Sequence, residues 1–189
     1  DGEEWVINGM KHFITHAGES DFIILFARTE PKDGDVNTHG ITTFLVPSDS
    51  EGISMQPQPV IRPEYPYQVQ LNDVRVPEAY VLGEVGEGLD IAKTCLGESR
   101  VLYAANCLGP IDQSIRMGIE WANDRIVGGK PLADRQAIQW KIAESAVDYA
   151  AAKHTVYHAA WKYDRGEDIR HVASMCKYKA TETLWEVLD

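Results

Sequence analysis

The sequence has few cysteines and no long apolar run, and both shortages narrow the classes of protein it can encode. Its three cysteines, Cys95, Cys107 and Cys176, are widely spaced and include no C-x-x-C pair. This pattern favours reduced thiols in a cytosolic protein over a disulfide framework or a zinc site. No run of 18 or more apolar residues occurs, so we expect no membrane insertion. The N-terminus also lacks a signal-peptide pattern.

Basic residues are scarce in the first half of the chain. The formal net charge is -11, and residues 1–90 carry 16 acidic and 5 basic side chains, whereas residues 91–189 carry 13 of each. Nucleic-acid binding needs a basic surface, so we expect no nucleic-acid partner. The acidic residues are scattered rather than clustered, which favours a solvated surface over a metal site.

The first 76 residues have the alternation and turn residues of a β domain. Asn8-Gly9 is typical of a hairpin turn and predicts two strands on either side of it. Six short strands favour a small antiparallel barrel or sandwich. The predicted strands are Glu4–Asn8, Lys11–Thr15, Phe22–Arg28, Ile41–Pro47, Ser54–Pro57 and Gln68–Val74.

The rest of the chain is predicted to be helical. The glycine-rich segment Gly83–Gly88 is interpreted as a flexible linker, because its spacing does not fit a dinucleotide-binding turn. Apolar periodicity predicts three helices, over 89–123 with a kink expected at Gly109-Pro110, 133–164 and 168–188. The predicted fold class is α+β, with a β-barrel or sandwich domain at 1–80 and a long-helix bundle at 87–189. The missing initiator Met and a helical pattern still running at Leu188 suggest a piece of a longer chain.

Three stretches carry candidate chemistry. Phe13, Ile14 and Thr15 place an aromatic, a β-branched residue and a hydroxyl at a strand end, although an ordinary edge strand has the same look. The loop 123–132 contains Arg125 and two glycines, which suit a pyrophosphate as well as a plain interhelical connection. Ser99 and Arg100 lie in a mostly apolar helix, where a cation needs a partner; a structural ion pair is the competing explanation.

Two further motifs are weaker. His154 and His158 are four residues apart on the second helix, but no third ligand is evident, so ordinary surface histidines are favoured. Gly128-Gly129-Lys130 is followed by Pro131 rather than by the Ser or Thr of a phosphate-binding loop. We therefore predict no metal site.

Taken in order, the motifs of this chain resemble those of the acyl-CoA dehydrogenase superfamily over nearly its whole length. They are Trp5–Thr15 (W-V-I-N-G-x-K-x-F-I-T), Ala27-Arg28, Phe44–Pro47 (F-L-V-P), Asn72–Pro77 (N-D-V-R-V-P), Leu82–Gly88 (L-G-E-x-G-E-G), Ser99-Arg100, Asp124–Leu132 (D-R-x-x-G-G-K-P-L) and Arg135–Gln139 (R-Q-A-I-Q). The resemblance implies a middle β-domain followed by the first part of a C-terminal helical bundle. It also implies FAD as cofactor, an acyl-CoA substrate desaturated to a trans-2-enoyl-CoA, and hydride transfer to flavin N5.

The resemblance further implies roles for single residues. Thr15 would offer its hydroxyl or amide to flavin N5. Phe13 would pack on the flavin ring, and Ile14, between them, would belong to the same cofactor-binding segment. Arg125 would contact the pyrophosphate or ADP portion of FAD bound to a neighbouring subunit, and Gln136 would follow in the same cofactor-facing segment. Ser99 and Arg100 would lie near the acyl-CoA.

The chain departs from the family pattern at the substrate side. Only Arg62 remains of a G-x-R-x-S motif, and no catalytic base is assigned. In a few relatives the catalytic glutamate immediately precedes the helix arginine. Here that position is Ser99, and Glu98 is one residue off, about 100° around the helix.

The resemblance also implies an electron-transferring flavoprotein as partner, a homodimer or homotetramer, and a bacterial cytoplasmic or mitochondrial matrix location. Two alternatives stay open. One is a flavin-dependent monooxygenase or nitroalkane oxidase of the same fold, and the other is a non-catalytic scaffold or binding relative.

Overall fold

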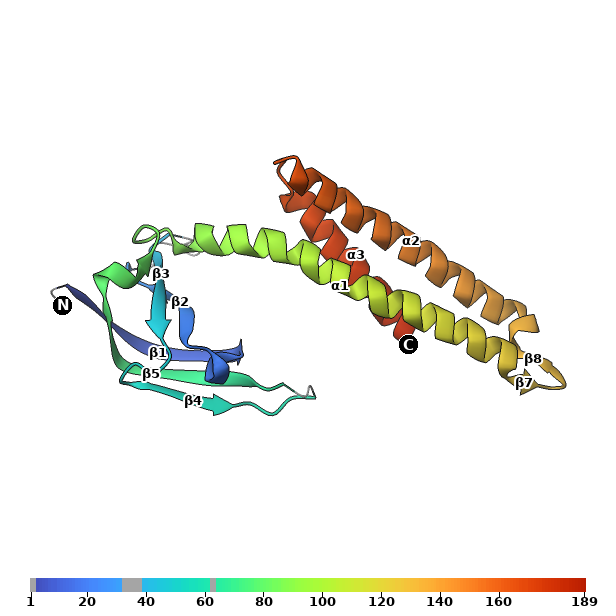
Figure 1. Cartoon of the computed structure of the whole chain (residues 1–189), viewed down its shortest axis with the longest axis horizontal. Helices are drawn as coiled ribbons and strands as arrows, with labels where there is room; N and C mark the ends of the chain where they lie inside the picture. Colours follow the sequence, from blue (N-terminus) through green and yellow to red (C-terminus); the bar gives the residue numbers. More distant parts are fainter. Residues whose placement is uncertain (1–2, 32–38, 62–63) are drawn as a thin grey trace. The chain divides into compact units, whose positions relative to one another are not determined.

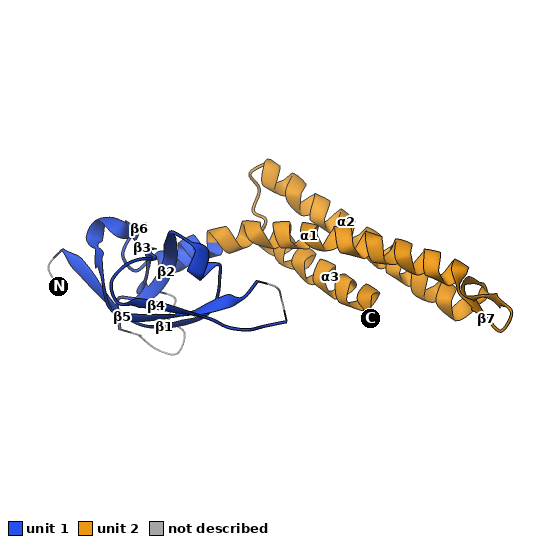
Figure 2. Ribbon diagram, turned by 60° about the horizontal axis from the view of Figure 1, so that its bottom comes forward, with its two compact units in different colours: residues 1–93 blue, residues 94–189 orange. Residues whose placement is uncertain are grey.

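The computed structural model describes residues 3–31, 39–61 and 64–189. Arg62, singled out above, lies outside these residues. The chain divides into two compact units, 1–93 and 94–189 (Figure 2). The first unit, which we call the β unit, holds the two main sheets, and the second, the helical unit, holds most of the three long helices (Figure 1).

The β unit consists of two antiparallel three-stranded sheets. The first has the order β1-β5-β4 and the second β2-β3-β6. Among the described residues β1 pairs only with β5 and β2 only with β3, so the sheets form no closed barrel. The strands β2 and β3 have the predicted bounds. The strands are β1 (Glu4–Thr15), β2 (Phe22–Arg28), β3 (Ile41–Pro47), β4 (Ile53–Pro57), β5 (Pro66–Pro77) and β6 (Val81–Leu82).

Large apolar side chains fill the core of the β unit. Alternation along the strands sends every second side chain inward. Phe44 is fully buried, and the ring of Trp5 meets it edge-on with centroids 5.6 Å apart. The other buried members are Ile7, Ala17, Leu25, Val46, Val69, Leu71, Val74 and Val76.

The hairpin predicted at Asn8-Gly9 is wrong. The strand β1 runs through both residues without turning, and a β-bulge sits there instead, with Asn72 and Asp73 of β5 opposite Asn8. The Asn8 amide stabilises this bulge, because its oxygen accepts from the Asp73 backbone N–H at 2.9 Å and its nitrogen donates to Asp73 Oδ1 at 2.9 Å. The asparagine thus stabilises a bulge against the distant strand β5 rather than a local turn.

The glycine-rich segment is not a flexible linker. It follows a short 3-10 helix, Glu78–Tyr80, and strand β6. Hydrogen bonds connect it to Thr42 of β3 and to Gly40, which directly precedes β3. The Gly86 N–H donates to the buried Thr42 hydroxyl at 2.9 Å, and the Gly40 N–H donates to the Gly86 carbonyl at 3.0 Å. A Cβ at Gly88 would lie 2.5 Å from Thr43 Oγ1, so the close approach requires glycine.

Three helices follow. They are α1 (Gly88–Asp124), α2 (Gln136–Asp164) and α3 (Arg170–Leu188). Pro110 lies inside α1, which continues past it as one helix. Gly166 ends the α2 segment in a left-handed conformation, and its N–H and that of Glu167 bond back to the carbonyls of Tyr163 and Lys162. Among the described residues no helix is both long and apolar enough to cross a membrane.

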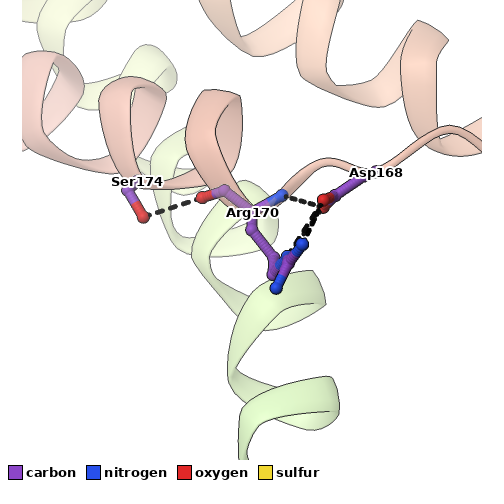
Figure 3. Close-up of polar contacts among 3 residues, drawn as sticks. All are labelled: Asp168, Arg170 and Ser174. Carbon is purple, nitrogen blue, oxygen red and sulfur yellow. Dashed lines mark hydrogen bonds and ion pairs between the residues drawn. The ribbon is translucent and has the colours of Figure 1, made fainter.

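Small side chains form the core of the helical unit. One buried cluster consists of Ala104, Ala152, Val156, Ala159, Cys176 and Ala180, and Ile111 of α1 is also fully buried. The start of α3 is fixed by Asp168, whose carboxylate accepts bonds from the Arg170 backbone N–H and guanidinium (Figure 3). The three cysteines are free, and burial raises the pKa values of the Cys107 and Cys176 thiols.

Candidate functional site

The end of β1 has an unusual backbone, and we call residues His12–His16 the lip. Lys11 pairs with Val69 and Ile14 with Tyr67, so two β1 residues, His12 and Phe13, stand opposite one residue of β5. This is a β-bulge, a feature that is common next to active sites because it redirects a side chain. Phe13 has a φ of 57°, which a bulky side chain seldom adopts.

The Phe13 side chain faces solvent. It is 65% exposed although it is aromatic. Its backbone N–H donates to Gln58 Oε1 at 2.9 Å, and Gln58 Nε2 lies 3.2 Å from His12 Nδ1. The Phe13 ring therefore presents a flat apolar face at the edge of the sheet. Its backbone is contacted by Gln58, which is distant in the sequence.

Thr15 ends β1 and is exposed, with a second left-handed residue directly after it. His16 has a φ of 60° and precedes the short 3-10 helix Ala17–Glu19. The His16 carbonyl accepts bonds from the Ser20 hydroxyl at 2.6 Å and the Glu19 N–H at 3.0 Å. Ile14 and Thr15 thus lie between two strained residues, and such strain is typical of functional sites.

The β unit also contains a cavity of about 480 Å³, but this cavity does not involve the lip. Residues 5–11 of β1 and residues 25–28 of β2, with Thr29, line most of it. Lys11 Nζ donates to the Phe26 carbonyl at 2.8 Å and so links the two strands. The lip itself is an exposed surface rather than a pocket.

The loop after α1 is a small hairpin. Strands β7 (Ile126–Val127) and β8 (Lys130–Pro131) pair around Gly128 and Gly129, both with positive φ. A short 3-10 helix, Leu132–Asp134, leads into α2, and Arg135 donates to the Val127 carbonyl at 2.9 Å. Arg125 precedes the hairpin and is exposed, and Gln136 is the first residue of α2.

Ser99 and Arg100 lie on α1 within the helical unit. The Ser99 hydroxyl donates to the Cys95 carbonyl at 2.6 Å, a bond within its own helix. Arg100 Nη1 lies 3.4 Å from the Ser174 hydroxyl of α3. Arg100 is half-buried. Among the described residues its hydrogen-bond partner is the Ser174 hydroxyl rather than a carboxylate.

The neighbouring Glu98 contacts a different helix. Its negative charge, and a hydrogen bond to its carboxylate, raise the pKa of the Tyr163 phenol on α2. Glu98 and Arg100 thus engage α2 and α3 respectively, as expected for residues two apart on a helix.

The predicted residues fall into three places. Phe13, Ile14 and Thr15 lie together at the lip; Arg125 and Gln136 lie at the two ends of the hairpin loop; Ser99 and Arg100 lie on α1. The first place is in the β unit and the other two are in the helical unit, so each is described by itself. Within the described ranges no three His, Cys, Asp or Glu side chains form a metal-binding group.

Two family models cover nearly the whole chain. The acyl-CoA dehydrogenase C-terminal domain matches residues 86–189, and the acyl-CoA dehydrogenase middle domain matches residues 1–74. The chain belongs to the acyl-CoA dehydrogenase family. This confirms the resemblance drawn from the motifs and agrees with the order of sheets and helices.

Individual acyl-CoA dehydrogenase relatives match over about half of their own length. A 3-(aryl)acrylate reductase of Clostridium sporogenes is 36% identical over 197 residues, 100% of this chain and 50% of its own. The butyryl-CoA dehydrogenase structure from Megasphaera elsdenii is 30% identical with a TM-score of 0.88, covering 97% of this chain and 48% of that one. A glutaryl-CoA dehydrogenase from Mycobacterium smegmatis, solved with FADH2, is 27% identical with a TM-score of 0.87, covering 99% and 47%.

Sequence reasoning missed Gln58, which contacts the lip, and His16, which belongs to it. Gln58 is 45 positions from Phe13, and nothing in the sequence links them. His16 had a weak signal, because histidine is one of the residues enriched in the left-handed region.

Proposed function

We propose that the whole protein is an FAD-dependent acyl-CoA dehydrogenase that desaturates an acyl-CoA thioester between Cα and Cβ to give a trans-2-enoyl-CoA. When bound, FAD would accept the hydride at N5. The exposed Phe13 in its strained bulge is the observation that carries this proposal. Membership of the family and the likeness to a structure solved with FADH2 support it.

The lip suits the flavin end of the cofactor. Phe13 offers an uncovered aromatic face, which favours stacking on a planar ring. Thr15, two residues on, offers an exposed hydroxyl that can donate a hydrogen bond to a ring nitrogen or oxygen. The strained backbone on both sides would keep these groups fixed and so orient the ring.

The hairpin loop suits the phosphate end. The Arg125 guanidinium is exposed and makes no hydrogen bond or ion pair with the described residues, so it is available to an anion. Gln136 adds an exposed amide at the N-terminus of α2, where the helix dipole also favours negative charge. In the proposed homodimer or homotetramer these groups would serve the cofactor of a neighbouring subunit.

The substrate side has candidate contacts but no base. Ser99 and Arg100 are proposed to lie near the acyl-CoA, with Ser174 holding the guanidinium. Glu98 already accepts a hydrogen bond from Tyr163, so we assign no catalytic base in these residues. We further propose that electrons leave through an electron-transferring flavoprotein.

The same site could work in the opposite direction, as a reductase of an activated C=C bond. The relative from Clostridium sporogenes supports this second candidate, since it is named a 3-(aryl)acrylate reductase. The two directions use the same flavin and the same pair of carbons, so they differ in the preferred substrate and electron partner rather than in the lip.

The test uses the whole protein under anaerobic conditions. Saturated acyl-CoA thioesters of several chain lengths are mixed with the oxidised protein, and flavin absorbance is followed. Bleaching with formation of an enoyl-CoA is expected. Flavin reduced with dithionite and then reoxidised by a 3-arylacrylate, with no bleaching by any saturated thioester, would favour the reductase. The absence of bound flavin from the purified protein would refute both.

A further inference from the structure

We propose that Gln58 is a positioning residue that holds Phe13 in its left-handed conformation and so sets the aromatic face for the flavin. This inference rests on the proposed function above. The role is assigned from geometry within the β unit, where one side chain contacts both residues of the bulge.

The bulge needs a partner because its backbone has left the ladder. His12 and Phe13 together face one residue of β5, so the regular pairing leaves the Phe13 N–H without a strand carbonyl. Gln58 Oε1 accepts this N–H at 2.9 Å. An unpaired amide would favour rearrangement of the bulge, and a φ of 57° for phenylalanine persists only where the surroundings hold it.

Gln58 is suited to this task because its own backbone is fixed. It follows β4, and its N–H donates to the Pro66 carbonyl at 2.8 Å at the start of β5. Its side chain is half-buried and crosses from the end of β4 to the end of β1. The three strand ends β1, β4 and β5 are thus connected through one residue.

Both polar atoms of the Gln58 side-chain amide make a hydrogen bond. With Oε1 accepting from Phe13, Nε2 is the donor toward His12 Nδ1 at 3.2 Å, which requires the tautomer with Nδ1 unprotonated. A leucine at position 58 would keep the size and remove both bonds. A glutamate would keep an acceptor for the Phe13 N–H.

The first measurement needs no cofactor. Amide hydrogen exchange of residues 12–15 is compared in the flavin-free whole protein for wild type, Gln58→Leu, Gln58→Glu and Gln56→Leu. Gln56 is exposed on β4 and serves as the matched control. We expect exchange at Phe13 to rise at least about tenfold in Gln58→Leu, and to stay near wild type in Gln58→Glu and Gln56→Leu.

The second measurement is FAD affinity, by titration of the same proteins. We expect Gln58→Leu to bind FAD about tenfold more weakly, with Gln58→Glu close to wild type. Far-UV circular dichroism and the urea midpoint check folding, and Gln58→Ala replaces Gln58→Leu if the latter does not fold.

Unchanged exchange in Gln58→Leu would overturn the proposal. Faster exchange with unchanged FAD affinity would overturn it too, because the conformation of Phe13 would then not serve the flavin. A wild-type protein that binds no FAD would refute the proposed function instead. Even then, the exchange measurement still tests whether Gln58 stabilises the conformation of Phe13. Unchanged exchange in Gln58→Leu would contradict this role, and faster exchange would support it.

Discussion

The two units are stabilised by cores of opposite character. The β unit buries large side chains such as Phe44, Val69 and Leu71, whereas the helical unit buries mostly alanines and Cys176. Large tryptophans of the helical unit, including Trp140 and Trp185, are instead more than half exposed. Sheets packed face to face leave space for aromatic and branched side chains, while helices that approach closely favour small side chains such as alanine.

The two cores should therefore fail under opposite substitutions. The β unit should be most sensitive to the loss of volume, and the helical unit to its gain. The lip belongs to the β unit, whose core has the larger side chains. Contacts in this unit can stabilise the unfavourable backbone conformation of the lip.

The largest effect is expected from Phe44→Ala. Phe44 is fully buried and packs against Trp5, so its removal leaves a cavity and should lower the free energy of unfolding by about 3–5 kcal/mol. Urea unfolding followed by circular dichroism measures the change. Leu45→Ala, the more exposed neighbour on the same strand, should lose much less; equal losses would contradict a core centred on Phe44.

The matching test in the helical unit is Ala159→Leu. Ala159 is fully buried among the three helices, and added methylene groups should destabilise the unit by about 1–3 kcal/mol. Ala151→Leu, on an exposed face of the same helix, is the control and should be nearly neutral. If Ala159→Leu proved neutral or stabilising, the inferred close packing of the helices would be wrong.

Local patterns predicted much of this architecture, and long-range contacts account for the failures. The strands β2 and β3 were predicted to the residue because strand-forming apolar and β-branched residues and flanking turns define them. Asn8-Gly9 misled because the Asn8 side chain bonds to Asp73, 65 residues away. The glycine-rich segment misled because Thr42, from another strand, accepts its N–H.

The candidate site shows the same limit. The motif placed Phe13 and Thr15 at a strand end, but neither the bulge nor the left-handed φ of Phe13 can be read from its own segment. Both depend on the register of β5 and on Gln58, which lie more than 40 positions further along the chain.

The smallest effect is expected at the start of α3. Hydrogen bonds from Arg170 lower the pKa of Asp168 to about 2 from 3.8, so the charged carboxylate stabilises the folded state above pH 3.8. That contribution should fade as the pH falls from 3.8 to about 2. The pair is solvent-exposed, so the effect should be smaller than those of the two core substitutions.

The pH dependence of the thermal midpoint measures this, with Asp168→Asn as the comparison. The midpoints of the two proteins should differ at neutral pH and converge in acid. A difference that persists unchanged at pH 2 would show that the carboxylate charge is not responsible.

The flavin role of the lip is tested most directly by the FAD affinity of Phe13→Ala beside that of Phe22→Ala in the whole protein. Both phenylalanines are exposed on strands of the β unit, at 65% and 52%. We predict that Phe13→Ala weakens FAD binding about tenfold, through loss of ring stacking, while Phe22→Ala leaves it unchanged. Equal affinities for the two variants and the wild type would contradict the assignment of the lip as the flavin-facing surface.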